Sequence, residues 1–123
     1  MNRHVLTIDL RDEPGVVETY CDHHARIWPE VAHSLASAGV ERMEIFLLGR
    51  RLVMILDLRE GLEIGQVFER HVASGPRVAE WERFMKSLQQ PAPGAGSGEW
   101  WSRMERIFTL PGPARSSGPG TVC

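Results

Sequence analysis

A tyrosine and a histidine four residues apart are the side chains of this sequence best suited to acid–base chemistry. Tyr20 and His24 lie one turn apart in a segment with helical spacing, so they share one face of the expected helix. A phenol beside an imidazole can bind a polar ligand and move a proton. The alternative is that both are buried amphipathic side chains with satisfied hydrogen bonds.

The four tryptophans form a second group of candidates, because each stands near a loop or helix end and within two residues of a charged side chain. A flat aromatic face next to hydrogen-bonding groups suits a sugar, whose C–H face stacks while its hydroxyls bond to charged side chains. We expect a ligand pocket, and the alternative is that the tryptophans fill the core or a subunit interface. The candidates, with the neighbouring carboxylates, are Trp28, Glu30, Trp81, Glu82, Trp100 and Trp101.

Metal and thiol chemistry have weak support. His33 and His71 have no Cys, Asp or Glu partner at metal-ligand spacing. Cys21 precedes His24 by three residues, so a thiolate–imidazole pair is conceivable, but no feature nearby resembles an oxyanion hole. The sequence therefore predicts no metal and no cofactor.

Composition indicates an ordinary globular protein. The chain has 123 residues, a net charge of −2 and no block of Lys or Arg, which argues against nucleic acid or a membrane as partner. Its two cysteines show no disulfide or metal pattern and its start shows no apolar signal core, so we expect a cytoplasmic protein. We expect one domain over residues 1–111 and a disordered tail over residues 112–123.

The first half of the chain predicts a strand followed by an interrupted helix. Alternation over residues 4–10 indicates the strand. Asp12 as cap and Pro14 in the first turn would begin the helix, which Gly39 would end. Pro29 lacks an amide hydrogen and would clash with the preceding turn, so the helix must kink or restart there; Glu30 has the alternative role of capping its second half.

The second half predicts a hairpin, two helical segments and a closing strand. Residues 41–48 and 51–58 are two strands joined by a tight turn, and the second is apolar enough to be a central strand covered on both faces. Helical spacing recurs over 64–71 and 78–88, and residues 104–110 alternate as a last strand.

This order of elements predicts an α+β fold of the ferredoxin-like, split βαβ type. Such an antiparallel sheet carries helices on one face, and its other face must be covered or solvated. Because the strands are rich in large apolar residues, we expect a second copy on the open face, which makes a dimeric α/β barrel and a homodimer.

The segment Tyr20-x-x-x-His24-x-x-Ile27-Trp28-Pro29-Glu30 resembles the first-helix signature of the L-rhamnose mutarotase family, which are small dimeric ferredoxin-like proteins. The resemblance covers residues 3–111. It implies that His24 is the proton donor and that Tyr20 contacts the sugar.

Two positions depart from the rhamnose-type members, which have a sugar-binding tyrosine at Met43 and a second tryptophan at Glu82. With the sequence around Trp81 and Trp101, these positions resemble the branch of L-fucose mutarotases, a different family from the decameric fucose mutarotases. Exchange of a stacking ring for a carboxylate would change which hydroxyl orientation is recognised, because a mismatched buried polar group is costly.

The sequence as a whole predicts an aldose mutarotase that interconverts the α and β pyranose anomers of a 6-deoxy-hexose, foremost L-fucose. General acid–base ring opening and closure needs no cofactor. L-Rhamnose is the alternative substrate. The alternatives from other classes are a non-enzymatic binding module and a haem- or polyketide-handling barrel enzyme. The expected catalytic residues are His24 and Tyr20, and the expected sugar-binding residues are Trp28, Met43, Trp81, Glu82 and Trp101.

Overall fold

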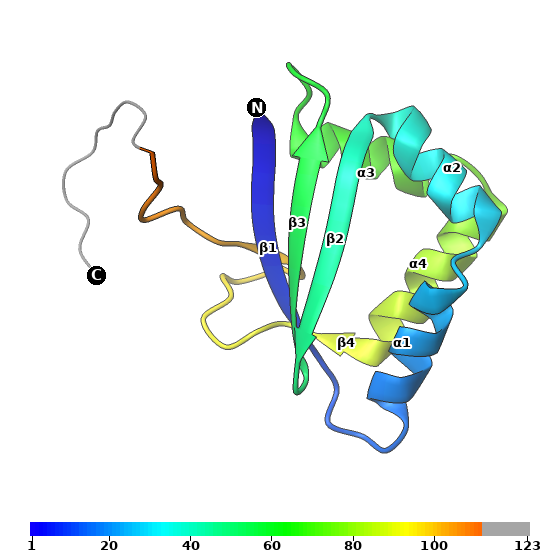
Figure 1. The fold of residues 1–123 in the computed structure, drawn as a ribbon. Coiled ribbons are helices and arrows are strands. Elements are labelled where there is room, and N and C mark those ends of the chain that lie inside the picture. The colour runs from blue at the N-terminus through cyan, green and yellow to red at the C-terminus, as the bar shows by residue number, and fades with distance from the viewer. Residues whose placement is uncertain (112–123) are drawn as a thin grey trace.

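An antiparallel sheet forms one layer of the protein and four helices form the other (Figure 1). The computed structural model describes residues 1–111, so the tail expected over 112–123 lies outside the described residues. The strand order is β2-β3-β1-β4, with β5 also paired to β1. The strands are β1 (Asn2–Leu10), β2 (Val40–Leu48), β3 (Arg51–Leu58), β4 (Gln89–Gln90) and β5 (Ser102–Arg103). The order β2-β3-β1-β4 is the strand order of the predicted ferredoxin-like fold.

The four helices lie on one face of the sheet (Figure 1). They are α1 (Val16–Ala25), α2 (Pro29–Ala38), α3 (Ile64–Val72) and α4 (Pro76–Leu88). The first predicted helical region is divided into α1 and α2, and the two helical segments predicted over 64–71 and 78–88 correspond to α3 and α4. Among the described residues, no helix is long and apolar enough to cross a membrane.

The interruption of the first helix at Pro29 is confirmed, but the predicted start is wrong. Pro29 is the first residue of α2, where its missing donor costs nothing, and Gly39 ends that helix with a left-handed φ of 117°. Asp12 and Pro14 precede α1 without capping it. The residue before the helix is Gly15, whose φ of 81° turns the chain into α1.

The sheet is buried on the side that faces the helices. Strand β3 pairs with β1 and β2, which confirms its central place. Its burial alternates, however: Leu52, Met54, Leu56 and Leu58 are buried, while the residues between them are half-buried. Within residues 1–111 no second layer packs on the outer face, so the coverage of both faces by a second copy stays a prediction.

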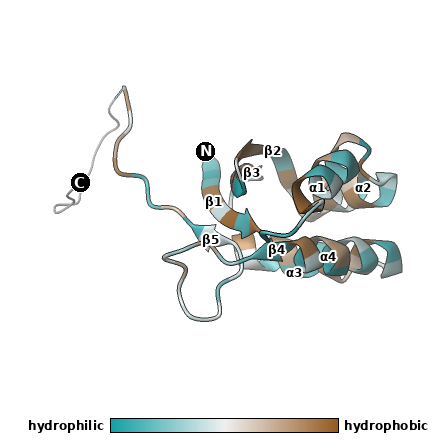
Figure 2. Ribbon diagram, turned by 90° about the horizontal axis from the view of Figure 1, so that it is seen from below, coloured by the Kyte–Doolittle hydropathy of each residue, from teal (hydrophilic) through white to brown (hydrophobic). Residues whose placement is uncertain are grey.

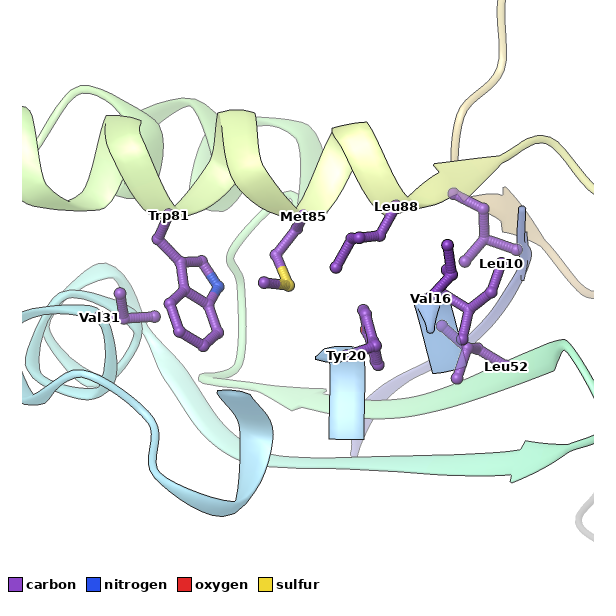
Figure 3. Close-up of a cluster of buried hydrophobic side chains, with 9 residues drawn as sticks. Leu10, Val16, Tyr20, Val31, Leu52, Trp81, Met85 and Leu88 are labelled. Atoms are coloured by element: carbon purple, nitrogen blue, oxygen red, sulfur yellow. The ribbon is translucent and has the colours of Figure 1, made fainter. Parts of the chain in front are cut away.

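The core lies between this inner face and the helices. Figure 3 shows Trp81, Met85 and Leu88 of α4 pointing toward Tyr20 of α1 and Val31 of α2. Residues three and four apart on α4 share one face of that helix. One row of its side chains therefore packs against both α1 and α2.

The predicted closing strand over 104–110 is wrong in position and length. Strand β5 consists of Ser102 and Arg103 alone, and residues 104–109 have no regular structure. After β5 the chain leaves the sheet on the side away from the helices (Figures 1 and 2), so it has no strand to pair with. Its apolar side chains are exposed, namely Met104, Ile107, Phe108 and Leu110.

Candidate active site

A cavity of about 410 Å³ lies between the helices and the inner face of the sheet. This is the size of a small-molecule site. Apolar side chains from β1, β2 and β3 line its floor, and polar groups from the helices and the final loop line its walls. Six of the seven predicted site residues border it: Tyr20, His24, Met43, Trp81, Glu82 and Trp101.

His24 presents a ring nitrogen with no partner among the described residues. Its Nδ1 lies 2.9 Å from the carbonyl oxygen of Tyr20, one turn earlier in α1. A carbonyl only accepts, so Nδ1 carries the hydrogen and Nε2 has a lone pair when the ring is neutral. Burial lowers the pKa of His24 below 6.5, which favours the neutral ring at pH 7.

Tyr20 holds the ring of His24 in place by stacking against it. The two rings stack with centroids 4.1 Å apart, and the tyrosine is buried. Burial raises the pKa of Tyr20, so its phenol keeps its proton throughout the physiological range. The cavity therefore contains a proton acceptor and a proton donor that are one helical turn apart.

Trp81 is shared by the cavity and the core. Its ring meets that of His24 edge-on at 5.4 Å and is buried. Trp28 does not border the cavity. It packs edge-on against Trp81 at 5.1 Å, and the guanidinium of Arg77 covers it at 3.7 Å. It supports the wall from behind.

Glu82 is the acidic side chain on the α4 wall, and it is held by a residue that the sequence analysis did not select. Its Oε2 lies 3.2 Å from Nε2 of His71 on α3. The other ring nitrogen of His71 lies 2.7 Å from Oγ of Ser34 on α2. The carboxylate of Glu82 on α4 and the hydroxyl of Ser34 on α2 are therefore joined through the buried imidazole of His71 on α3.

The last wall comes from the loop before β5. Trp100 and Trp101 border the cavity, and the indole nitrogen of Trp100 donates to Oε1 of Gln89 at 2.9 Å. Met43 lies on β2 as part of the floor. Charged side chains also line the cavity, namely Lys86, Glu99 and Arg103.

Glu30 lies elsewhere. It borders a second hollow, on the outer side of α2 near the start of α4, together with His33, Arg70 and Arg77. This hollow contains none of the predicted catalytic residues. Within residues 1–111, no group of three or more His, Cys, Asp or Glu side chains is placed to hold a metal ion.

Several polar residues of the site were missed, among them His71 and Gln89. Their partners are distant in sequence, so spacing along one helix gave no sign of them. One signal was available for His71: it occupies the inward stripe of α3 with Ile64 and Val67, and a polar side chain on such a stripe requires hydrogen-bond partners.

The geometry defines a class of protein: a ferredoxin-like α+β domain with an aromatic cavity equipped for proton transfer. Comparison with known proteins identifies the family. A family model described as L-rhamnose mutarotase matches residues 3–110. The chain belongs to the L-rhamnose mutarotase family, which makes it a sugar mutarotase, a carbohydrate isomerase that acts on anomers.

One relative agrees with this assignment in sequence, and two solved structures agree with it in fold. The chain is 37% identical over 112 residues to an L-fucose mutarotase of Xanthomonas campestris, covering 89% of each sequence. The structure of L-rhamnose mutarotase from Formosa agariphila is similar with a TM-score of 0.63 at 20% identity, covering 89% of this chain and 99% of that one. A dimeric ferredoxin-like protein from an uncultured marine organism matches with a TM-score of 0.52 at 15% identity, covering 87% and 91%. These structures confirm the predicted ferredoxin-like α+β fold of the single chain, and the dimeric barrel stays a prediction.

Proposed function

We propose that this mutarotase acts on a 6-deoxy-hexose, foremost L-fucose, with His24 and Tyr20 as the acid–base pair. The observation that carries the proposal is Nε2 of His24, which faces an aromatic cavity and has no partner within residues 1–111. The similarity to the L-fucose mutarotase of Xanthomonas campestris supports the choice of sugar. So do Met43 and Glu82, the two positions at which the sequence departs from rhamnose-type members.

Anomer exchange needs two coupled proton transfers. Nε2 of His24 takes the proton of the anomeric hydroxyl as the bond between C1 and the ring oxygen breaks. The phenol of Tyr20 donates its proton to that ring oxygen, since an alkoxide is a stronger base than a phenolate. The open-chain aldehyde rotates about C1–C2. Closure returns the proton from the ring-oxygen hydroxyl to Tyr20, and the imidazolium of His24 donates to the new anomeric oxygen.

The remaining side chains would hold the sugar. Trp81 and Trp101 offer aromatic faces to the C–H side of the pyranose, while the carboxylate of Glu82 accepts from a ring hydroxyl. Met43 lends an apolar floor that fits the methyl group of a 6-deoxy sugar, and Trp28 contributes by supporting Trp81.

We also propose that the enzyme is a cytoplasmic homodimer. The outer face of the sheet carries Val5, Phe46, Val53 and Ile55 at its centre, all exposed or half-buried in the single chain. The exposed apolar segment after β5 runs away from the helices on this side of the molecule (Figure 2). A second copy would cover both. The exposed thiol of Cys21 fits a reducing compartment.

The test is exchange NMR on the anomeric protons of L-fucose and L-rhamnose with catalytic amounts of protein. We expect protein-dependent exchange between the α and β signals, faster for L-fucose. Faster exchange of L-rhamnose would make that sugar the substrate, in agreement with the family model and the Formosa agariphila structure. Binding of sugar without exchange by the folded protein would overturn the proposal in favour of a binding module.

A further inference from the structure

We propose that His71 is a positioning residue, which holds the carboxylate of Glu82 in the orientation that accepts a hydrogen bond from a sugar hydroxyl. This inference rests on the proposed function, because the bound sugar is what gives the carboxylate its role. His71 itself is 1% exposed and forms its side-chain contacts through partners on neighbouring helices.

The carboxylate partner of His71 determines which ring nitrogen carries the hydrogen when the ring is neutral. The carboxylate of Glu82 accepts, so Nε2 of His71 carries a hydrogen toward Oε2 at 3.2 Å. Nδ1 of the neutral ring then accepts from the hydroxyl of Ser34 at 2.7 Å. Ser74 stands behind this pair: its Oγ lies 2.7 Å from that of Ser34 and donates to the carbonyl oxygen of His71, also at 2.7 Å. Every polar atom of the imidazole has a partner.

This chain of contacts constrains the carboxylate. Turning the ring of His71 would break the bonds at both of its nitrogens, and the bond to Ser34 is buried away from water. Because Oε2 of Glu82 is engaged, Oε1 is the oxygen left for a ligand in the cavity. A glutamate held in one rotamer before the sugar arrives loses less conformational entropy on binding.

Packing alone does not explain a histidine at this position. The other inward residues of α3 are Ile64 and Val67, which stabilise the core by burial. An imidazole there requires hydrogen-bond partners, and the chain supplies Ser34 on one side and Glu82 on the other. Of these two partners, Glu82 borders the cavity. The hydrogen-bonded set of Ser34, His71 and Glu82 therefore ends at the place where a ligand would bind.

The first experiment is a double-mutant cycle on kcat/KM for anomer exchange, measured per folded protein, with His71→Leu, Glu82→Ala and the double variant. We expect about a tenfold loss for each single variant and about the same loss for the double variant, because both remove one interaction. His71→Gln keeps a donor near Nε2 and should retain most of the activity. His4→Gln, on β1 and away from the cavity, is the matched control.

Losses that multiply in the double variant, or full activity of His71→Leu, would overturn the inference. A second readout does not depend on catalysis: in protein with ¹⁵N-labelled histidine, the Nε2–H signal of His71 should be protected from exchange, shift in Glu82→Gln and vanish in His71→Gln. Absence of that signal refutes the contact whatever the activity. If the signal is present but the wild type exchanges neither sugar, the proposed function has failed and the role of His71 toward a sugar fails with it.

Discussion

His24 and His71 border the same cavity, and each has one ring nitrogen bound to a fixed partner, yet they differ at the second nitrogen. On the α1 wall, Nδ1 of His24 donates to a backbone carbonyl and Nε2 has no partner among the described residues. On the α3 and α4 wall, His71 has Ser34 at one nitrogen and Glu82 at the other.

This difference distinguishes a histidine that can transfer a proton to the substrate from one that orients a neighbouring side chain. An imidazole that transfers a proton needs a nitrogen open to the substrate and a neutral form at working pH, and His24 has both. An imidazole with both nitrogens bonded to protein groups has none open to the substrate, but it fixes its neighbours. We therefore assign chemistry to the α1 wall and recognition of hydroxyl orientation to the α3 and α4 wall.

Replacement of Trp81 should damage both walls. Its buried ring contacts His24 and supports the core between α4 and α2. We expect Trp81→Ala to lower the free energy of unfolding by about 3–5 kcal/mol, as for other large aromatic-to-alanine changes in cores. Urea unfolding measures this, with Trp100→Ala, half-buried on the loop, as a milder control. Equal losses for the two variants would show that Trp81 is not a shared support.

Removal of the phenol should affect the chemical wall alone. Tyr20→Phe keeps the ring stacked on His24 but lacks the proton for the ring oxygen. We expect kcat to fall about a hundredfold, in the range of general acid catalysis, with little change in melting temperature. Wild-type kcat in this variant would move the donor role to another group or to water.

Loss of the charge at Glu82 should affect recognition more than reaction. We expect Glu82→Gln to lower kcat/KM for L-fucose about tenfold, largely through KM, and to lower the preference for L-fucose over L-rhamnose. Steady-state rates on both sugars measure this. A fall confined to kcat would instead make Glu82 a proton carrier and erase the contrast between the walls.

The pH dependence should sharpen the assignment of His24. Burial lowers its pKa below 6.5, and the neutral ring is the reactive base, so kcat/KM should be level above pH 6.5 and fall as the pH drops through the lowered pKa. Stability changes in the same direction: the contribution of this group is complete above pH 6.5 and is lost on acidification. An activity limb with its midpoint at or above 6.5 would contradict a buried neutral His24.

Features set by local chemistry could be predicted from the sequence. Pro29 divides the helical region because proline lacks the amide hydrogen that a residue inside a helix must donate. Tyr20 and His24 meet because they are four residues apart on one helix. The order of elements likewise gave the fold, since each strand and helix has its own periodicity.

Features that depend on partners distant in the sequence could not be predicted from it. The set of Ser34, His71 and Glu82 joins three helices, and no single segment shows that they meet. Trp28 has the residue type of a sugar platform, but the helix break turns it toward Arg77. The segment after β5 alternates as a strand would, yet strand structure requires a neighbour, and the single chain has none there.

The most direct test of the central claim compares wild type, His24→Gln and His23→Gln in the anomeric exchange assay. The two histidines are adjacent and each bonds through Nδ1 to a carbonyl one turn earlier at 2.9 Å, but only His24 borders the cavity. We expect His24→Gln to lose about 10²–10⁴-fold in rate while His23→Gln keeps the wild-type rate. A folded His24→Gln protein that exchanges L-fucose anomers as fast as the wild type would contradict the assignment of His24 as the proton-transfer group.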